Sequence, residues 1–464
     1  MNKLISLVVV IVLIALFYLW KRKFFTNVFK IEELRTKLLI TVAFVAIYRF
    51  GTTIVLPGID SAALGRLHEQ TGGGLMSLLD MFSGGAFSNA SVFALGIMPY
   101  ISASIVVQLL AMVVPYFQKM QREGESGRRK INQITRYLTI LVLIIQAPAY
   151  LINLTQTAPG AINPGVSAPV FYITSTIILA AGSMFILWLG ERITDKGIGN
   201  GISFIILIGI IARFPQAVIQ ELTSRMAGAA GGGLVMFLAE IVALFFVFIA
   251  AIMLTQGVRR IPVQYAKQMQ GGKQFGGARQ YIPLKVNAAN VMPIIFAQAI
   301  MFIPLSFINY SKLENAGEFV RLMVDTDSWL YNLIFAILII LFTLFYTAIT
   351  INPTQMAEDL KRNNGFIPGV KPGKATADYI DTVMSRITWP GALFLVVIAI
   401  LPPFARMFGV SREFAQFFGG TSLLIMVGVV LDTLQQIESH LLMRHYDGLL
   451  STGTRIRGRA GGAY

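Results

Sequence analysis

The sequence has no cysteine and very little charge. Only 13% of its 464 residues are Asp, Glu, Lys or Arg, and three are histidine. Without thiols the chain cannot form a disulfide, a thiol nucleophile or a zinc–thiolate site. The histidines, His68, His440 and His445, are dispersed and lack the spacing of metal ligands. The sequence therefore predicts no enzyme site, no metal and no cofactor.

Apolar residues are what the sequence has in excess: they make up 55% of the chain and give a mean hydropathy of +0.68. This composition is typical of a polytopic membrane protein. Apolar runs near the roughly 20 residues that cross about 30 Å of hydrocarbon recur along the chain. We predict an all-α protein with ten core membrane spans, at Leu38–Val55, Ser91–Val114, Tyr137–Ile152, Phe171–Leu189, Ile202–Ala212, Leu234–Leu254, Val291–Ile308, Trp329–Ile351, Ile387–Leu401 and Phe417–Leu431.

One predicted span is interrupted. Ser91–Val114 carries no charge, but Gly96 and Pro99 free backbone groups that lipid cannot satisfy. We therefore expect this segment to line a protein-enclosed pathway, with Ile97 and Ile101 one helical turn apart on a single face. The alternative is an ordinary packed helix, because many membrane helices tolerate proline.

A second predicted span, Ile202–Ala212, is short, because Arg213 and Pro215 are expected to close it early. Ten spans divide into five and five, and an odd number in each half inverts the second half relative to the first. Pro293 interrupts the second span of the second half, and the corresponding span of the first half is interrupted as well. Such paired interruptions favour an inverted repeat around a central pathway.

Lys and Arg are distributed unevenly between the predicted loops. Most of the 38 lie in alternate segments, and the positive-inside rule places these segments in the cytosol with both ends of the core. The net charge of +15 is therefore largely explained by topology and does not by itself indicate nucleic acid. The basic segments are residues 21–37, 115–136, 191–200, 257–288, 352–386 and 436–464.

A further apolar run, Leu4–Trp20, precedes the core and is followed by Lys21, Arg22 and Lys23. No small-residue cleavage site follows it, and the basic cluster lies after the run. We expect an uncleaved anchor that adds an N-terminal helix with its amino end outside.

Charge within the predicted spans is scarce: Arg49, Glu240 and Asp432. They fall singly, without the carboxylate and histidine chains of a proton-coupled transporter, so a structural or snorkelling role is expected for each.

Several sequence blocks resemble those of the SecY family, the central subunit of the bacterial protein-conducting channel. The blocks occur in family order from residue 31 to about residue 447. They are Leu56–Asp60, Met81–Gly85, Phe93–Ser104, Glu123–Lys130, Gly197–Ser203, Pro283–Asn287 and Phe418–Leu424.

The resemblance implies two inverted five-helix halves arranged as a clamshell, with an hourglass pore between them and a lateral gate towards lipid. The halves are residues 31–233 and 234–436, preceded by an anchor segment and linker at 1–30 and followed by a cytosolic tail at 437–464. The family's apolar pore ring corresponds to Ile97, Ile101, Ile202, Ile206, Ile295 and Ile425.

Four of the six residues form two pairs spaced i,i+4: Ile97 with Ile101, and Ile202 with Ile206. The two side chains of each pair therefore project from the same face of their helix. Composition alone would make such residues core or lipid-facing. A narrow apolar ring is poorly wetted, so an ion crossing it would lose its hydration.

Glycines at 72–74 and 84–85 bracket a segment, 75–83, that is too short to cross a bilayer. Taken without the resemblance, the residues of this segment fit an interfacial helix or an ordinary outer loop at least as well as a plug. The resemblance implies a plug at residues 72–85, which closes the pore from outside and is hinged by glycine. Its apolar contacts would come from Met76, Leu79, Met81 and Phe82.

Two predicted cytosolic loops, 257–288 and 352–386, are longer than bare connections and contain prolines that suggest shaped loops. Their basic residues either enforce orientation alone or bind a partner. The resemblance assigns them to docking of the SecA motor ATPase and of the translating ribosome, whose RNA phosphates attract such charge. Lys371 stands where the family usually has arginine, which keeps the charge but loses the bidentate fork. The docking residues are Arg259, Arg260, Lys361, Arg362 and Lys371.

The resemblance also implies SecE as a brace of the two halves, SecG as a peripheral subunit, and SecD, SecF and YidC as accessory partners. We expect a passive channel in the bacterial cytoplasmic membrane that passes unfolded polypeptides across or releases them into membrane lipid. A small-solute transporter, with a polar site at the midplane, and a scaffold without a pathway are the alternatives.

Overall fold

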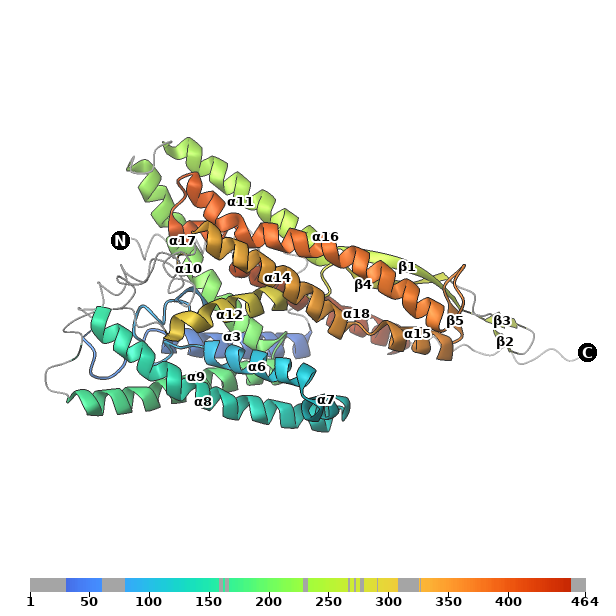
Figure 1. The fold of residues 1–464 in the computed structure, drawn as a ribbon, viewed down its shortest axis with the longest axis horizontal. Helices are drawn as coiled ribbons and strands as arrows, with labels where there is room; N and C mark the ends of the chain where they lie inside the picture. The colour runs from blue at the N-terminus through green and yellow to red at the C-terminus, as the bar shows by residue number, and fades with distance from the viewer. Residues whose placement is uncertain are drawn as a thin grey trace, which may run out of the picture.

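The chain folds into a bundle of long helices with a small sheet at one end (Figure 1). The computed structural model describes residues 31–60, 80–157, 162, 167–227, 233–265, 268–270, 273–275, 279–289, 291–307, 325 and 327–451. The predicted anchor Leu4–Trp20 and the plug residues Met76 and Leu79 lie outside the described residues.

Each of the ten predicted spans coincides with a described helix. Among the described residues, seven helices are long and apolar enough to cross a membrane, and the chain is therefore a multi-span membrane protein. The spans assigned to α3, α6 and α12 stay predictions: α3 contains several charged residues, and 16 residues of α6 or α12 cover only about 24 Å. The helices are α3 (Glu32–Gly51), α6 (Met98–Val113), α8 (Glu125–Thr157), α9 (Ala168–Lys196), α10 (Gly201–Met226), α11 (Gly233–Gln256), α12 (Met292–Phe307), α14 (Trp329–Thr350), α16 (Lys374–Met407) and α18 (Gly420–Ser451).

The helices pack as two groups. In the first, α8 and α9 pack on each other, α6 packs on α8, and α3 and α10 pack on α9. In the second, α14 packs on both α12 and α16, and α18 packs on α16 and α11. Helices α6, α8 and α9 gather on one side of Figure 1, and α11, α14 and α16 on the other. Helix α10 joins the groups, because it contacts both α11 and α18.

The expected interruption of the second span lies at its start. Residues 92–97 form turns, Gly96 has a left-handed φ of +54°, and α6 begins only at Met98 with Pro99 in its first turn. Proline is well placed there, because the first turn has no backbone acceptor for its missing N–H. The short helix α7 (Pro115–Arg122) follows α6 at a bend of 101°.

The expectation that Arg213 and Pro215 close the fifth span is wrong. Helix α10 passes through both residues and ends at Met226. Membrane proteins tolerate an internal proline where neighbouring groups satisfy the freed backbone, and the charge of Arg213 is neutralised by an ion pair with Asp80.

The two long loops predicted at 257–288 and 352–386 form one structure. Strand β1 (Val258–Tyr265) pairs antiparallel with β4 (Arg279–Lys285) and with β5 (Gly365–Phe366). Helix α15 (Pro353–Arg362) packs on β5 and α16. A separate core, which includes Ile261, Leu284 and Ile380, fixes these elements together. We call β1, β4, β5 and α15 the sheet unit; it lies at one end of the bundle, alongside α16, in Figure 1. The strands β2 (Gln268–Gln270) and β3 (Lys273–Phe275) pair with each other.

Glu240 is not a lone charge, contrary to expectation. Its Oε1 accepts a short hydrogen bond from Arg225 Nη2, and Arg225 Nε donates to Glu221 Oε1 at 2.9 Å. All three side chains are at least 95% buried, and Glu221 also accepts from the backbone N–H of Ser411. Glu221 and Arg225 lie beyond residue 212, where the sequence predicted the span to end, so they were not counted as membrane charges.

Replacing Arg225 by Met should destabilise the protein strongly, because it leaves the Glu221 and Glu240 carboxylates buried without their cation. We expect a loss of about 3–5 kcal/mol in the free energy of unfolding, measured by denaturant unfolding in detergent. The matched control is Arg129→Met, which breaks an exposed pair with Glu125 and should cost only about 0–1 kcal/mol. Equal, small losses would show that the buried network does not hold α10 to α11.

Candidate functional site

The six predicted ring residues come together. Helix α10 supplies Ile202 and Ile206, α6 supplies Ile101 with Ile97 at its N-cap, α12 supplies Ile295 and α18 supplies Ile425. All six lie in or against one hydrophobic cluster. Ile97, Ile206 and Ile425 are at least 95% buried, and the other three are half-buried. Four helices from both groups therefore meet in one apolar cluster, which we call the constriction.

A small cavity of about 20 Å³ lies at this constriction. Four of the six isoleucines line it, and Ile97 and Ile202 do not. Ile202 packs instead towards α9, where its Cγ1 lies 3.1 Å from the position of a Cβ on Gly190. An ion entering this cavity would meet few polar groups to replace its water. The lining residues are Phe82, Met98, Ile101, Ser102, Ile206, Ile295, Gln298 and Ile425.

The described part of the predicted plug lies against the constriction. Met81 and Phe82 are buried in the same cluster as the isoleucines, and Phe82 lines the cavity. We call residues 80–97 the outer segment, because the predicted topology places it on the outer side. It runs from the end of the predicted plug directly into the constriction.

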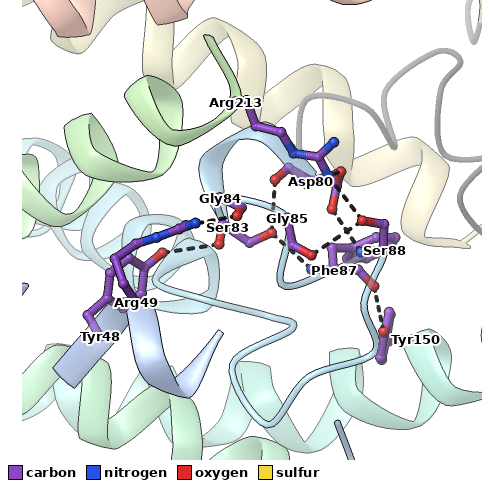
Figure 2. Close-up of polar contacts among 10 residues, drawn as sticks. All are labelled: Tyr48, Arg49, Asp80, Ser83, Gly84, Gly85, Phe87, Ser88, Tyr150 and Arg213. Carbon is purple, nitrogen blue, oxygen red and sulfur yellow. Dashed lines mark hydrogen bonds and ion pairs between the residues drawn. The ribbon is translucent and has the colours of Figure 1, made fainter. Parts of the chain in front are cut away.

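The backbone of the outer segment is held by hydrogen bonds from surrounding helices (Figure 2). Tyr48 Oη donates to the Ser83 carbonyl at 3.1 Å, and Arg49 Nη1 donates to the Gly84 carbonyl at 3.0 Å. From α8, Tyr150 Oη donates to the Phe87 carbonyl at 2.9 Å. Arg49, which was predicted as a lone membrane charge, therefore has a structural partner.

An ion pair joins the outer segment to α10. The Asp80 Oδ2 atom pairs with Arg213 Nη2, and Asp80 Oδ1 accepts from the backbone N–H of Ser88 at 2.8 Å. Arg213 Nη2 also donates to Ser88 Oγ at 3.0 Å. As Figure 2 shows, these groups form one connected network with the turn between residues 83 and 88.

Glycines allow the outer segment to approach three helices closely. A Cβ on Gly209 of α10 would lie 2.6 Å from the Phe82 carbonyl oxygen. A Cβ on Gly182 of α9 would lie 2.3 Å from the Val92 carbonyl oxygen, and one on Gly51 of α3 would lie 2.0 Å from the Phe93 ring. No other residue leaves room for these contacts without movement.

The predicted docking residues all lie on or beside the sheet unit, and all are exposed. Arg259 and Arg260 are on β1, Lys361 and Arg362 end α15, and Lys371 lies in the turn before α16. Lys361 and Arg362 also complement the negative end of the α15 dipole. The structure thus gathers the two predicted docking loops into one unit that carries these basic residues.

Sequence reasoning missed the residues that hold the outer segment: Tyr48, Asp80, Tyr150 and Arg213. They come from helices or turns far apart in the chain, and none belongs to a motif with fixed spacing. The one available signal was Arg213, a basic residue that directly follows an apolar run and therefore needs a partner if the helix continues.

Comparison with known proteins agrees with this geometry. The SecY family model matches residues 91–434. The protein translocase subunit SecY of Thermotoga maritima is 41% identical over 440 residues, which cover 94% of this chain and 99% of the relative.

Solved structures share the fold. A SecY structure, whose plug domain is described as stabilising the closed state of the translocation channel and maintaining a membrane seal, matches with a TM-score of 0.61 at 18% identity. Sec61 from a canine ribosome–channel complex matches with a TM-score of 0.56 at 17% identity. Each match covers 91% of this chain and 95% of the other. The extent of the family match and the identity to the Thermotoga maritima relative show that this chain belongs to the SecY family.

Proposed function

We propose that this chain forms the channel of a protein translocase, which passes unfolded secretory proteins across the cytoplasmic membrane and inserts membrane proteins into it. The observation that carries the proposal is the apolar constriction, to which four helices from both groups contribute. The family membership of the chain supports the same function, because the relative from Thermotoga maritima is named a protein translocase subunit.

The constriction suits a channel that must pass polypeptides but retain ions. An ion at Ile206 or Ile425 would lose most of its water and find only Ser102 and Gln298 as polar groups beside it, so its passage is unfavourable. An extended polypeptide would meet branched aliphatic walls without groups that select particular side chains. The outer segment and the plug add a second seal, because Phe82 already reaches the cavity.

Opening requires the two groups of helices to part. The proposed lateral gate lies between α6 and α8 of the first group and α12 and α14 of the second, while α10 and α11 keep the groups joined on the other side. A signal sequence would enter between these helices, displace the plug and leave a route across the membrane or sideways into lipid.

The force for transport comes from a partner in this proposal. The sheet unit offers Arg259, Arg260 and Lys371 to the SecA motor or to phosphates of the translating ribosome. SecE would brace the two halves and SecG would bind at the periphery, with SecD, SecF and YidC as accessory partners. Both ends of the ten-span core would lie in the cytosol, on the side of the sheet unit.

The proposal is tested by reconstituting the chain with SecE, SecG and SecA in vesicles together with a secretory precursor. We expect ATP-dependent protection of the precursor from added protease, and crosslinks from the arrested precursor to probes at residues 97 and 425. Protection in the absence of ATP, or none in its presence, would contradict it.

Polar substitutions in the constriction should make the resting channel leak. The double variant Ile206→Thr, Ile425→Thr introduces hydroxyls that offset about 1–3 kcal/mol of the cost of removing water from an ion. We therefore expect ion conductance without substrate to rise about 5- to 150-fold, measured across planar bilayers. The matched control, Ile173→Thr with Ile177→Thr, changes exposed residues of α9 and should not leak. A small-solute transporter would not show this difference.

Reversing charge on the sheet unit should weaken ribosome binding. If Arg259 and Arg260 each contact an RNA phosphate, Arg259→Glu with Arg260→Glu should lower the slope of log affinity against log salt by about 2. The measurement is ribosome co-sedimentation with proteoliposomes over a salt series. The control, Arg128→Glu with Arg129→Glu, changes exposed residues outside the sheet unit. An unchanged slope in the first variant would show that Arg259 and Arg260 do not bind RNA phosphates and only help to set the orientation of the chain in the membrane.

A further inference from the structure

We propose that the ion pair between Asp80 and Arg213 is the latch that keeps the outer segment closed on α10 until a substrate displaces it. The inference rests on the proposed channel function and assigns these two residues a positioning role in it. Neither residue touches the substrate path in the closed state described here, because neither lines the cavity at the constriction.

The first argument is the location of the pair. Asp80 directly precedes Met81 and Phe82, the two residues that close on the constriction. Arg213 lies on α10 two helical turns beyond Ile206, and Gly209 between them is the point where α10 touches the backbone of the outer segment. The pair therefore fastens the outer segment next to the seal itself.

The second argument is burial. The Asp80 side chain is 7% exposed and that of Arg213 is 14% exposed. A charge pair shielded from water is stronger than a neutral hydrogen bond, and either charge alone is costly at that place. Moving the outer segment off α10 separates the pair, so the closed position is favoured over any partly open one.

The third argument is that Asp80 couples the ion pair to the shape of the segment. Its second oxygen accepts from the backbone N–H of Ser88, and Arg213 donates to the hydroxyl of the same serine. The turn between residues 80 and 88 is thus folded around the charges. By contrast, Tyr48, Arg49 and Tyr150 bind only backbone carbonyls of the segment.

The fourth argument is that Arg213 has another carboxylate in range. Glu413 lies on the short helix α17 (Arg412–Ala415), which packs on α10, and it interacts favourably with Arg213. Arg49 is the opposing like charge. When Asp80 leaves, Glu413 still offsets part of the charge of Arg213, which lowers the cost of opening the latch.

The test compares single and double variants in the complex with SecE and SecG. Asp80→Asn removes the charge but keeps an oxygen for the Ser88 N–H, and Arg213→Gln removes the other charge. We expect each to raise resting ion conductance about tenfold and to allow transport of a precursor with a defective signal sequence. The double variant should leak no more than either single variant, because both remove the same interaction.

Three comparisons make the result decisive. Tyr150→Phe removes a neutral hydrogen bond from the same segment and should raise conductance much less than either charge variant. Arg213→Lys keeps the charge without the planar fork and should leak to an intermediate extent. Deleting residues 72–79 of the plug should leak whether or not the latch exists, and so tests the channel itself.

The latch is overturned if the Asp80→Asn and Arg213→Gln effects add, if Tyr150→Phe leaks equally, or if neither charge variant leaks while the plug deletion does. Leakage confined to variants that lose thermal stability relative to Tyr150→Phe would also count against it. If the plug deletion and the Ile206→Thr, Ile425→Thr variant both stay closed, it is the channel function that fails.

Discussion

A non-helical backbone can lie at membrane depth only where protein satisfies its hydrogen bonds, and the outer segment shows how this chain meets that constraint. Tyr48, Arg49 and Tyr150 supply donors to its carbonyls, and Asp80 supplies an acceptor for one of its N–H groups. Glycines on α3, α9 and α10 bring the supporting helices close enough for these bonds to form. The apolar seal at Phe82 depends on this support, because the segment has no regular secondary structure over most of its length.

Helix α10 unites features that would otherwise look unrelated. Along one helix it carries two residues of the constriction, the glycine that receives the outer segment, the arginine paired with Asp80 and the buried network of Glu221 and Arg225. It is also the helix that joins the two groups. Continuity through Pro215 is what makes this possible, since a helix that ended at Ala212 would carry only the first two features.

Much of the fold could be predicted from sequence because hydrophobic length is a local property. Each of the ten core runs coincides with a helix, and the break at Gly96 lies within two residues of the start of α6. The convergence of the isoleucines came from the family resemblance, since composition gave no reason to separate them from lipid-facing residues. Pairings between distant segments could not be predicted: Asp80 with Arg213, Arg225 with Glu240, and β1 with β5 each depend on where two elements meet in space. The helix that passes through Pro215 was misjudged because a local rule for proline was applied to a residue whose neighbours compensate for it.

The connections of the sheet unit have a mechanical consequence. Strand β1 continues directly from α11, β4 leads into α12, and α15 lies between α14 and α16. Every covalent link from the sheet unit into the described bundle therefore runs to the second group of helices, and none to the first. In the proposed function, a partner bound to this unit would act directly on the second group of helices, and on α3, α6, α8 and α9 only through the contacts between the groups.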